Sequence, residues 1–120
     1  MKRTAIIIAT AIVFSVLCAT ATYAGDYETR QARSYMRNAE TKMRQAENYR
    51  RQADSYKRSA DSDRRQMETY LRRDNKTNAE TYRRRMQQNL DRAEDYNKRA
   101  QQSDRQAADL LSDAAYILRR

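Results

Sequence analysis

The chain of 120 residues contains no proline, tryptophan or histidine, and only one glycine, one cysteine and one phenylalanine. Loops and β-turns rely on glycine, proline, asparagine and aspartate for their unusual backbone angles. A single short stretch, residues 74–78, holds a cluster of such residues. The scarcity of turn residues therefore predicts a chain that is almost entirely helical.

The same absences exclude several kinds of chemistry. Without histidine or a glycine-rich loop, and with its one cysteine inside an apparent leader, the chain lacks the residues of a catalytic triad, a zinc site or a phosphate-binding loop. Most carboxylates have an arginine or lysine at helical spacing, which is typical of surface ion pairs. We predict that the protein is not an enzyme, and that it binds no cofactor, no metal and no small-molecule substrate.

The N-terminus has the pattern of an export signal. Lys2 and Arg3 precede a largely apolar stretch over residues 5–18, and small residues lead to Ala24. We predict a signal peptide over residues 1–24 and a mature chain over residues 25–120, located in the periplasm, the cell envelope or the medium. Removing Lys2 and Arg3 leaves 23 basic against 16 acidic residues, a net charge of +7. An uncleaved membrane anchor is the alternative, because this segment is just long enough to span a bilayer.

From Ala32 to the C-terminus the sequence is an array of heptads with one interruption, at residues 74–78. The low hydrophobicity and high charge are also typical of disorder, but disorder does not produce so regular an apolar period. Position a is always alanine or methionine, and position d is most often tyrosine. The a positions are Ala32, Ala39, Ala46, Ala53, Ala60, Met67, Ala79, Met86, Ala93, Ala100, Ala107 and Ala114. The sequence therefore predicts a coiled coil.

Acidic residues at position b precede basic residues at position f by four residues, the order that favours helix formation. The predicted pairs are Glu40–Arg44, Glu47–Arg51, Asp54–Arg58, Asp61–Arg65, Glu68–Arg72, Glu80–Arg84 and Glu94–Lys98. These pairs stabilise each helix, but they do not indicate which other helix it packs against.

The interruption predicts a turn between two helices, because it puts the apolar stripe out of phase on a continuous helix. Thr77 followed by Glu80 has the pattern of a capping box that begins the second helix. We predict helices over residues 27–73 and 79–118 and a turn over 74–78. The predicted fold class is all-α, a long antiparallel two-helix coiled-coil hairpin with alanine-rich heptads.

The residues of the two helices fit this antiparallel register. Pairs whose numbers sum to 149, such as Ala53 with Tyr96, set a small side chain against a large one, which fills the seam. A domain-swapped dimer would use the same pairs and stays open. At the flanking e positions the predicted pairs are Met36 with Leu118, Met43 with Leu111, and Arg50 with Asp104.

An alanine seam buries little area, so oligomerisation would help the fold. Apolar residues at the e positions near the two chain ends suit that purpose. We predict self-association, or binding to other envelope proteins, through these side chains: Met36, Met43, Leu111 and Leu118.

A basic cluster surrounds the predicted turn. It consists of Arg72, Arg73, Lys76, Arg83, Arg84 and Arg85, called here the basic tip. One interpretation is a solvated surface that keeps the protein soluble. The other is a docking site for an acidic lipid, lipopolysaccharide or another extracellular polyanion.

The a-position alanines, among them Ala39, Ala46, Ala53 and Ala60, resemble the alanine-zipper region of bacterial outer-membrane murein lipoproteins. The resemblance covers most of the mature chain and implies a structural role in the envelope. Two departures bear on anchoring. Leu17 before Cys18 does not fit a lipidation signal, and the chain ends in arginines without the lysine that would attach it to peptidoglycan. We therefore expect an exported structural or scaffolding protein, with polyanion binding as the alternative function.

Overall fold

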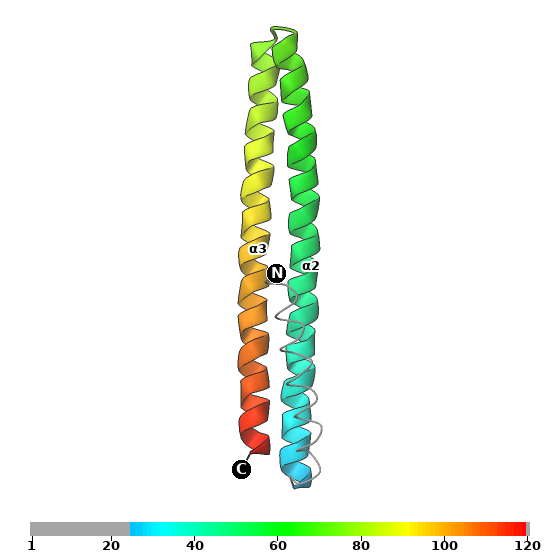
Figure 1. Ribbon diagram of the computed structural model, residues 1–120, viewed down its shortest axis with the longest axis vertical. Coiled ribbons are helices and arrows are strands. Elements are labelled where there is room, and N and C mark those ends of the chain that lie inside the picture. The colour runs from blue at the N-terminus through cyan, green and yellow to red at the C-terminus, as the bar shows by residue number, and fades with distance from the viewer. Residues whose placement is uncertain (1–24, 120) are drawn as a thin grey trace. The chain divides into compact units, whose positions relative to one another are not determined.

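The computed structural model describes residues 25–119, which form two long α-helices joined by a tight turn (Figure 1). Helix α2 spans Asp26–Arg72 and helix α3 spans Lys76–Leu118. The predicted all-α class is confirmed for the described residues, and the two helices pack against each other. The predicted signal peptide, residues 1–24, lies outside the described residues.

The chain divides into two compact units, each containing part of both helices. Arg44–Asp104 form the turn unit, which contains more than half of α2, the turn and more than half of α3. Of the described residues, those from 25 to 43 and from 105 to 119 form the terminal unit, in which the start of α2 packs on the end of α3. In each unit the two helix segments run antiparallel (Figure 1).

Burial follows the predicted heptads. Ala39, Ala46 and Ala53 are completely buried, and every a and d position from Ala32 to Ile117 is buried or half-buried. The tyrosines at position d are half-buried, because their rings fill the seam while their outer edges reach solvent. Positions b, c and f are almost all exposed. The heptad period of the sequence therefore predicts which side chains of both helices are buried.

A left-handed residue ends α2. Asp74 has a φ of 54°. Its N–H donates to the Leu71 carbonyl at 3.1 Å, and the Asn75 N–H donates to the Tyr70 carbonyl at 2.9 Å. This pair of bonds is a Schellman motif, in which glycine normally occupies the left-handed position. Aspartate tolerates that conformation better than most residues do, so the chain turns here without glycine.

Asn75 begins α3 as its N-cap. Its side-chain oxygen accepts the Asn78 N–H at 3.1 Å, which satisfies a donor that the first helical turn leaves unpaired. The predicted turn over 74–78 is therefore too long, since the turn covers residues 73–75. The predicted capping box is also wrong: Thr77 lies inside α3, and the Glu80 carboxylate accepts hydrogen bonds from Arg83 instead.

Asp74→Gly should stabilise the protein. Glycine reaches a φ of 54° without the steric cost that a Cβ imposes. Its greater freedom in the unfolded chain offsets part of the gain. We expect a net increase of about 0.5–1 kcal/mol in the free energy of unfolding, measured by urea denaturation. A loss of stability in Asp74→Gly would contradict the Schellman geometry.

Asn75→Ala removes the N-cap of α3. It should lower the free energy of unfolding by about 1 kcal/mol in the same measurement.

Candidate functional site

The tyrosines of the turn unit form a stack across the seam. The Tyr96 ring of α3 lies between two rings of α2, with its centroid 6.0 Å from that of Tyr49 and 5.6 Å from that of Tyr56. Tyr70 and Tyr82 stack at 5.5 Å. Tyr96 is therefore level with Ala53, midway between Tyr49 and Tyr56, which is the register that the sequence predicts.

These contacts define two sides of the seam in the turn unit. The d positions of both helices lie together on one side, called here the tyrosine face: Tyr49, Tyr56, Tyr70, Tyr82 and Tyr96. On the opposite side the e positions meet, and Arg50 donates to Asp104 as predicted. An antiparallel pair of heptads places d beside d and e beside e in this way.

Three arginines at position g of α3 border the tyrosine face. The Arg85 guanidinium lies 5.2 Å from the Tyr82 ring centroid, and that of Arg99 lies 5.3 Å from the Tyr96 centroid. Arg92 reaches across the seam to the Tyr56 ring of α2, at 5.7 Å. Such cation–π contacts are worth roughly 0.5–1 kcal/mol each at exposed sites, so the arginines help to hold the rings in place.

One layer of the seam is polar. Asp63 is only 6% exposed, and its carboxylate accepts a hydrogen bond of 2.8 Å from the Asn89 amide. The Arg85 Nε lies 3.7 Å from the other Asp63 oxygen. Both residues occupy d positions, and the rule that paired residue numbers sum to 149 would set Asp63 opposite Met86 and Asn89 opposite Ala60. In the structure they bind each other, because a buried carboxylate needs a donor.

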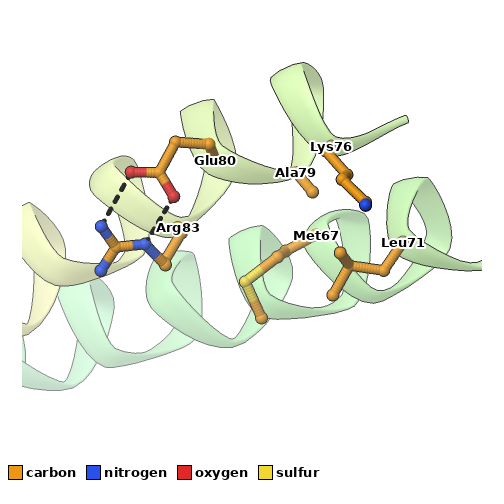
Figure 2. Close-up of a pocket in the computed structure, with 6 residues that line it drawn as sticks. All are labelled: Met67, Leu71, Lys76, Ala79, Glu80 and Arg83. Atoms are coloured by element: carbon orange, nitrogen blue, oxygen red, sulfur yellow. Dashed lines mark hydrogen bonds and ion pairs between the residues drawn. The ribbon is translucent and has the colours of Figure 1, made fainter. Parts of the chain in front are cut away.

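The predicted basic tip is partly neutralised from within the chain. Arg83 donates two hydrogen bonds to the Glu80 carboxylate, at 2.7 and 2.8 Å (Figure 2). Arg84 donates a third at 3.2 Å. The hydrogen bond from Arg83 is the largest cause that lowers the pKa of Glu80, from 4.5 to about 2. Arg85, with its ion pair to Asp63, is also engaged. Half of the predicted polyanion site therefore already has an acidic partner.

The other three cations of the basic tip, Arg72, Arg73 and Lys76, are exposed. Lys76 lines a shallow hollow of about 220 Å³ beside the turn (Figure 2). The remaining lining residues are Met67, Leu71, Ala79, Glu80 and Arg83. Two cations, Lys76 and Arg83, and one carboxylate, Glu80, stand around the apolar side chains of the hollow. Since Arg83 is already hydrogen-bonded to Glu80, Lys76 is the main contribution of the hollow to binding an anion.

In the terminal unit, three of the four predicted self-association residues, Met36, Met43 and Leu111, lie in one apolar cluster. Leu111 is 8% exposed and packs with Ala39 and Ala107, and the half-buried Met36 and Met43 pack against them. Leu118, the fourth predicted residue, is half-buried near the end of α3. The apolar surface thus extends beyond the a and d stripe to the e positions.

The predicted b–f ion pairs Glu47–Arg51, Glu80–Arg84 and Glu94–Lys98 are present in the structure. Asp61 and Glu68 instead both lie within 4 Å of Arg64, at 3.9 and 3.7 Å. An arginine three residues after one acid and four before another can reach both, which the b–f pattern alone does not reveal.

Residues 25–119 contain no cluster of acidic, histidine or cysteine side chains that could hold a metal ion. Neither described helix has an apolar stretch long enough to cross a membrane. Comparison with known proteins finds no matching family model, no similar curated protein and no similar solved structure.

Acid should weaken the turn unit through Glu80. A carboxyl whose pKa is lowered on folding stabilises the fold above its unfolded value of 4.5, and this contribution disappears as the pH falls to about 2. We expect the Glu80 carboxyl to titrate near pH 2 by NMR at low salt. Because the pair is exposed, high salt should move that midpoint back toward 4.5. A midpoint near 4.5 at low salt would rule out the double hydrogen bond from Arg83.

Proposed function

We propose that this protein is a structural, self-associating coiled-coil protein of the bacterial cell envelope, and that a second copy docks on the terminal unit. The observation that carries the proposal is the half-buried pair Met36 and Met43, which packs against Ala39, Ala107 and Leu111. An apolar surface of this kind on a helix pair is typical of a docking face.

The pattern of e positions supports this assignment. In the terminal unit the e positions opposite each other carry Met36, Met43, Leu111 and Leu118. In the turn unit most of them are polar or charged. A helix that is apolar at a, d and e has the wide stripe of a bundle with three or more helices, whereas a two-helix seam needs only a and d. A second copy could present the same surface and close such a bundle by two-fold symmetry.

The envelope location rests on the export pattern of residues 1–24 and on the resemblance of the alanine heptads to murein lipoproteins. The alternative function, docking of the basic tip on a polyanion, rests on Arg72, Arg73 and Lys76, because the three remaining arginines already contact Glu80 or Asp63. Fewer available cations favour the scaffold over the polyanion-binding module.

The proposal is tested by the mass of the protein in solution. If the wild-type protein is an oligomer, the double variant Met36→Gln/Met43→Gln should be a monomer. Light scattering measures the mass, and circular dichroism should show that the helices are retained. The matched control is Leu71→Gln with Leu90→Gln. These two leucines also occupy e positions and are 52% and 42% exposed, but lie in the turn unit. Their replacement should leave the mass unchanged.

Two outcomes would overturn self-association. One is a wild-type protein that stays monomeric at the highest soluble concentration. The other is an oligomer that resists the methionine changes but dissociates in the leucine control. Changing Arg72, Arg73 and Lys76 to glutamine tests the alternative, since polyanion docking predicts loss of binding to anionic vesicles and a strong dependence on salt.

A further inference from the structure

Charged side chains avoid two rows of α2 in the turn unit. The heptad c and g positions of α2 in this unit carry only amides and hydroxyls, up to the last c position before the turn. They are Gln45, Asn48, Gln52, Ser55, Ser59, Ser62, Gln66 and Thr69, called here the uncharged rows. The b and f positions, which lie farther from the tyrosine face on the same helix, are charged without exception in this unit: Arg44, Glu47, Arg51, Asp54, Arg58, Asp61, Arg65, Glu68 and Arg72. Solvation alone would not require charged and uncharged polar side chains to occupy separate positions of the helix.

The uncharged rows lie beside the tyrosine face. Position g adjoins position d on a helix, and the Gln45 amide donates to the Tyr49 hydroxyl at 3.2 Å. All members of the uncharged rows are exposed except Thr69, which is half-buried. On the far side of the rings lie Arg85, Arg92 and Arg99 of α3. One continuous surface therefore presents amides and hydroxyls, then phenol groups, then guanidinium groups.

We propose that this surface binds a linear polysaccharide. Sugar hydroxyls both donate and accept hydrogen bonds, and so do amide, serine, threonine and tyrosine side chains. The ring planes of Tyr49, Tyr56 and Tyr96 are turned toward one another or toward arginines, so the tyrosines offer their edges and hydroxyls to a ligand. Ser59 and Thr69 donate to backbone carbonyls at 3.2 and 2.9 Å, which leaves their oxygens as acceptors.

Other polymers fit this surface less well. A nucleic acid is bound mainly through cations that neutralise its phosphates, and the uncharged rows supply none. The arginines across the rings are partly balanced, since Arg85 lies 3.7 Å from Asp63 and Arg99 lies 3.4 Å from Asp95. A partner helix or a membrane surface would require apolar anchors, which the rows lack. A polymer rich in hydroxyl groups matches the amide, hydroxyl and phenol groups of this surface.

The repeat of the surface suits a repeating ligand. Equivalent positions recur every seven residues, which is about 10 Å along the helix, and the uncharged rows extend for about 36 Å. Each hydrogen bond to a sugar is weak on its own because water competes for both partners. Successive sugars of one chain would bind successive heptads, and the effective concentration of the second and later contacts would raise the affinity.

The test measures binding of three hexasaccharides to the purified full-length protein: neutral cellohexaose, N-acetylated chitohexaose and acidic hexagalacturonate. The chain has no tryptophan, and five of its nine tyrosines belong to the tyrosine face, so tyrosine fluorescence includes a large contribution from that face. The variant Asn48→Ala/Gln52→Ala/Gln66→Ala removes three amides from the uncharged rows. The matched control, Arg51→Ala/Arg58→Ala/Arg65→Ala, removes three exposed side chains from position f of the same helix.

We expect at least one hexasaccharide to bind, the amide variant to weaken it at least tenfold, and the arginine control to weaken it less than twofold. Binding of hexagalacturonate alone would assign an acidic glycan held by Arg85, Arg92 and Arg99. The inference is overturned if no hexasaccharide binds, if only the arginine control weakens binding, or if single-stranded DNA binds more tightly than every sugar. These outcomes are independent of self-association, which depends on the terminal unit.

Discussion

Ala100→Leu should lower the free energy of unfolding by about 1–3 kcal/mol. Ala100 is 2% exposed at an a position of α3. The heptad register places it opposite Tyr49, whose ring already lies 6.0 Å from that of Tyr96. A leucine cannot fit into the space of one methyl group, so either the rings or the helices must move apart. Thermal and urea denaturation of the variant would measure the loss.

The matched control is Gln101→Leu, one residue further along α3. Gln101 is exposed at position b, and substitutions at such positions usually change stability by no more than about 0.5 kcal/mol. If Ala100→Leu instead raises the melting temperature while Gln101→Leu has no effect, the seam contains empty space opposite Tyr49. The close packing described for the turn unit would then be incorrect.

Asn89→Leu should also destabilise the protein, by about 1–3 kcal/mol, because it leaves a buried carboxylate without its best donor. Asp63 is 6% exposed and accepts the Asn89 amide at 2.8 Å. Arg85, at 3.7 Å, compensates only in part. Asp63→Leu with Asn89→Leu replaces both polar partners by apolar ones, and such replacements are often neutral or stabilising. The double variant should therefore recover most of the lost stability.

The double-mutant cycle separates this polar layer from ordinary packing. Two independent packing losses would add, so a double variant less stable than either single variant would contradict a specific Asp63–Asn89 interaction. We also expect the double variant to hold its register less strictly, as buried polar pairs specify alignment in other coiled coils. Mixed disulfide registers between engineered cysteines in that background would reveal such slippage.

The long regular parts of the fold could be predicted from the sequence because one period governs them. The heptad pattern identified the buried alanines, the half-buried tyrosines and the contact between Arg50 and Asp104. The helix ends could not be predicted in the same way. Several polar residues compete to cap α3, and the pattern favoured Thr77. Asn75 caps it instead, because Asp74 adopts the left-handed conformation and brings the chain round earlier.

The candidate sites were harder to predict, because a sequence pattern gives spacing but not partners. The b–f pattern paired Glu80 with Arg84 alone, yet the same carboxylate also accepts two hydrogen bonds from Arg83, which the pattern left without a partner. Nor does spacing alone show that Asp63 meets Asn89, since that contact depends on how two d residues from different helices turn toward each other. The uncharged rows can be read from the sequence, but only the structure shows that they lie beside the tyrosine face and could form one binding surface with it.

Cross-linking of Ala46 to Ser103 tests the antiparallel pairing of the two helices most directly. Both residues are buried and small, and their numbers sum to 149, so cysteines at these positions should replace them with little strain. In a Cys18→Ser background, Ala46→Cys/Ser103→Cys should oxidise to an intrachain disulfide in dilute protein, detected as a monomer of increased mobility on a non-reducing gel. Ala46→Cys/Gln101→Cys, with one outward-facing thiol, should not. A disulfide that forms only between chains, or equally in both variants, would contradict the pairing within one chain.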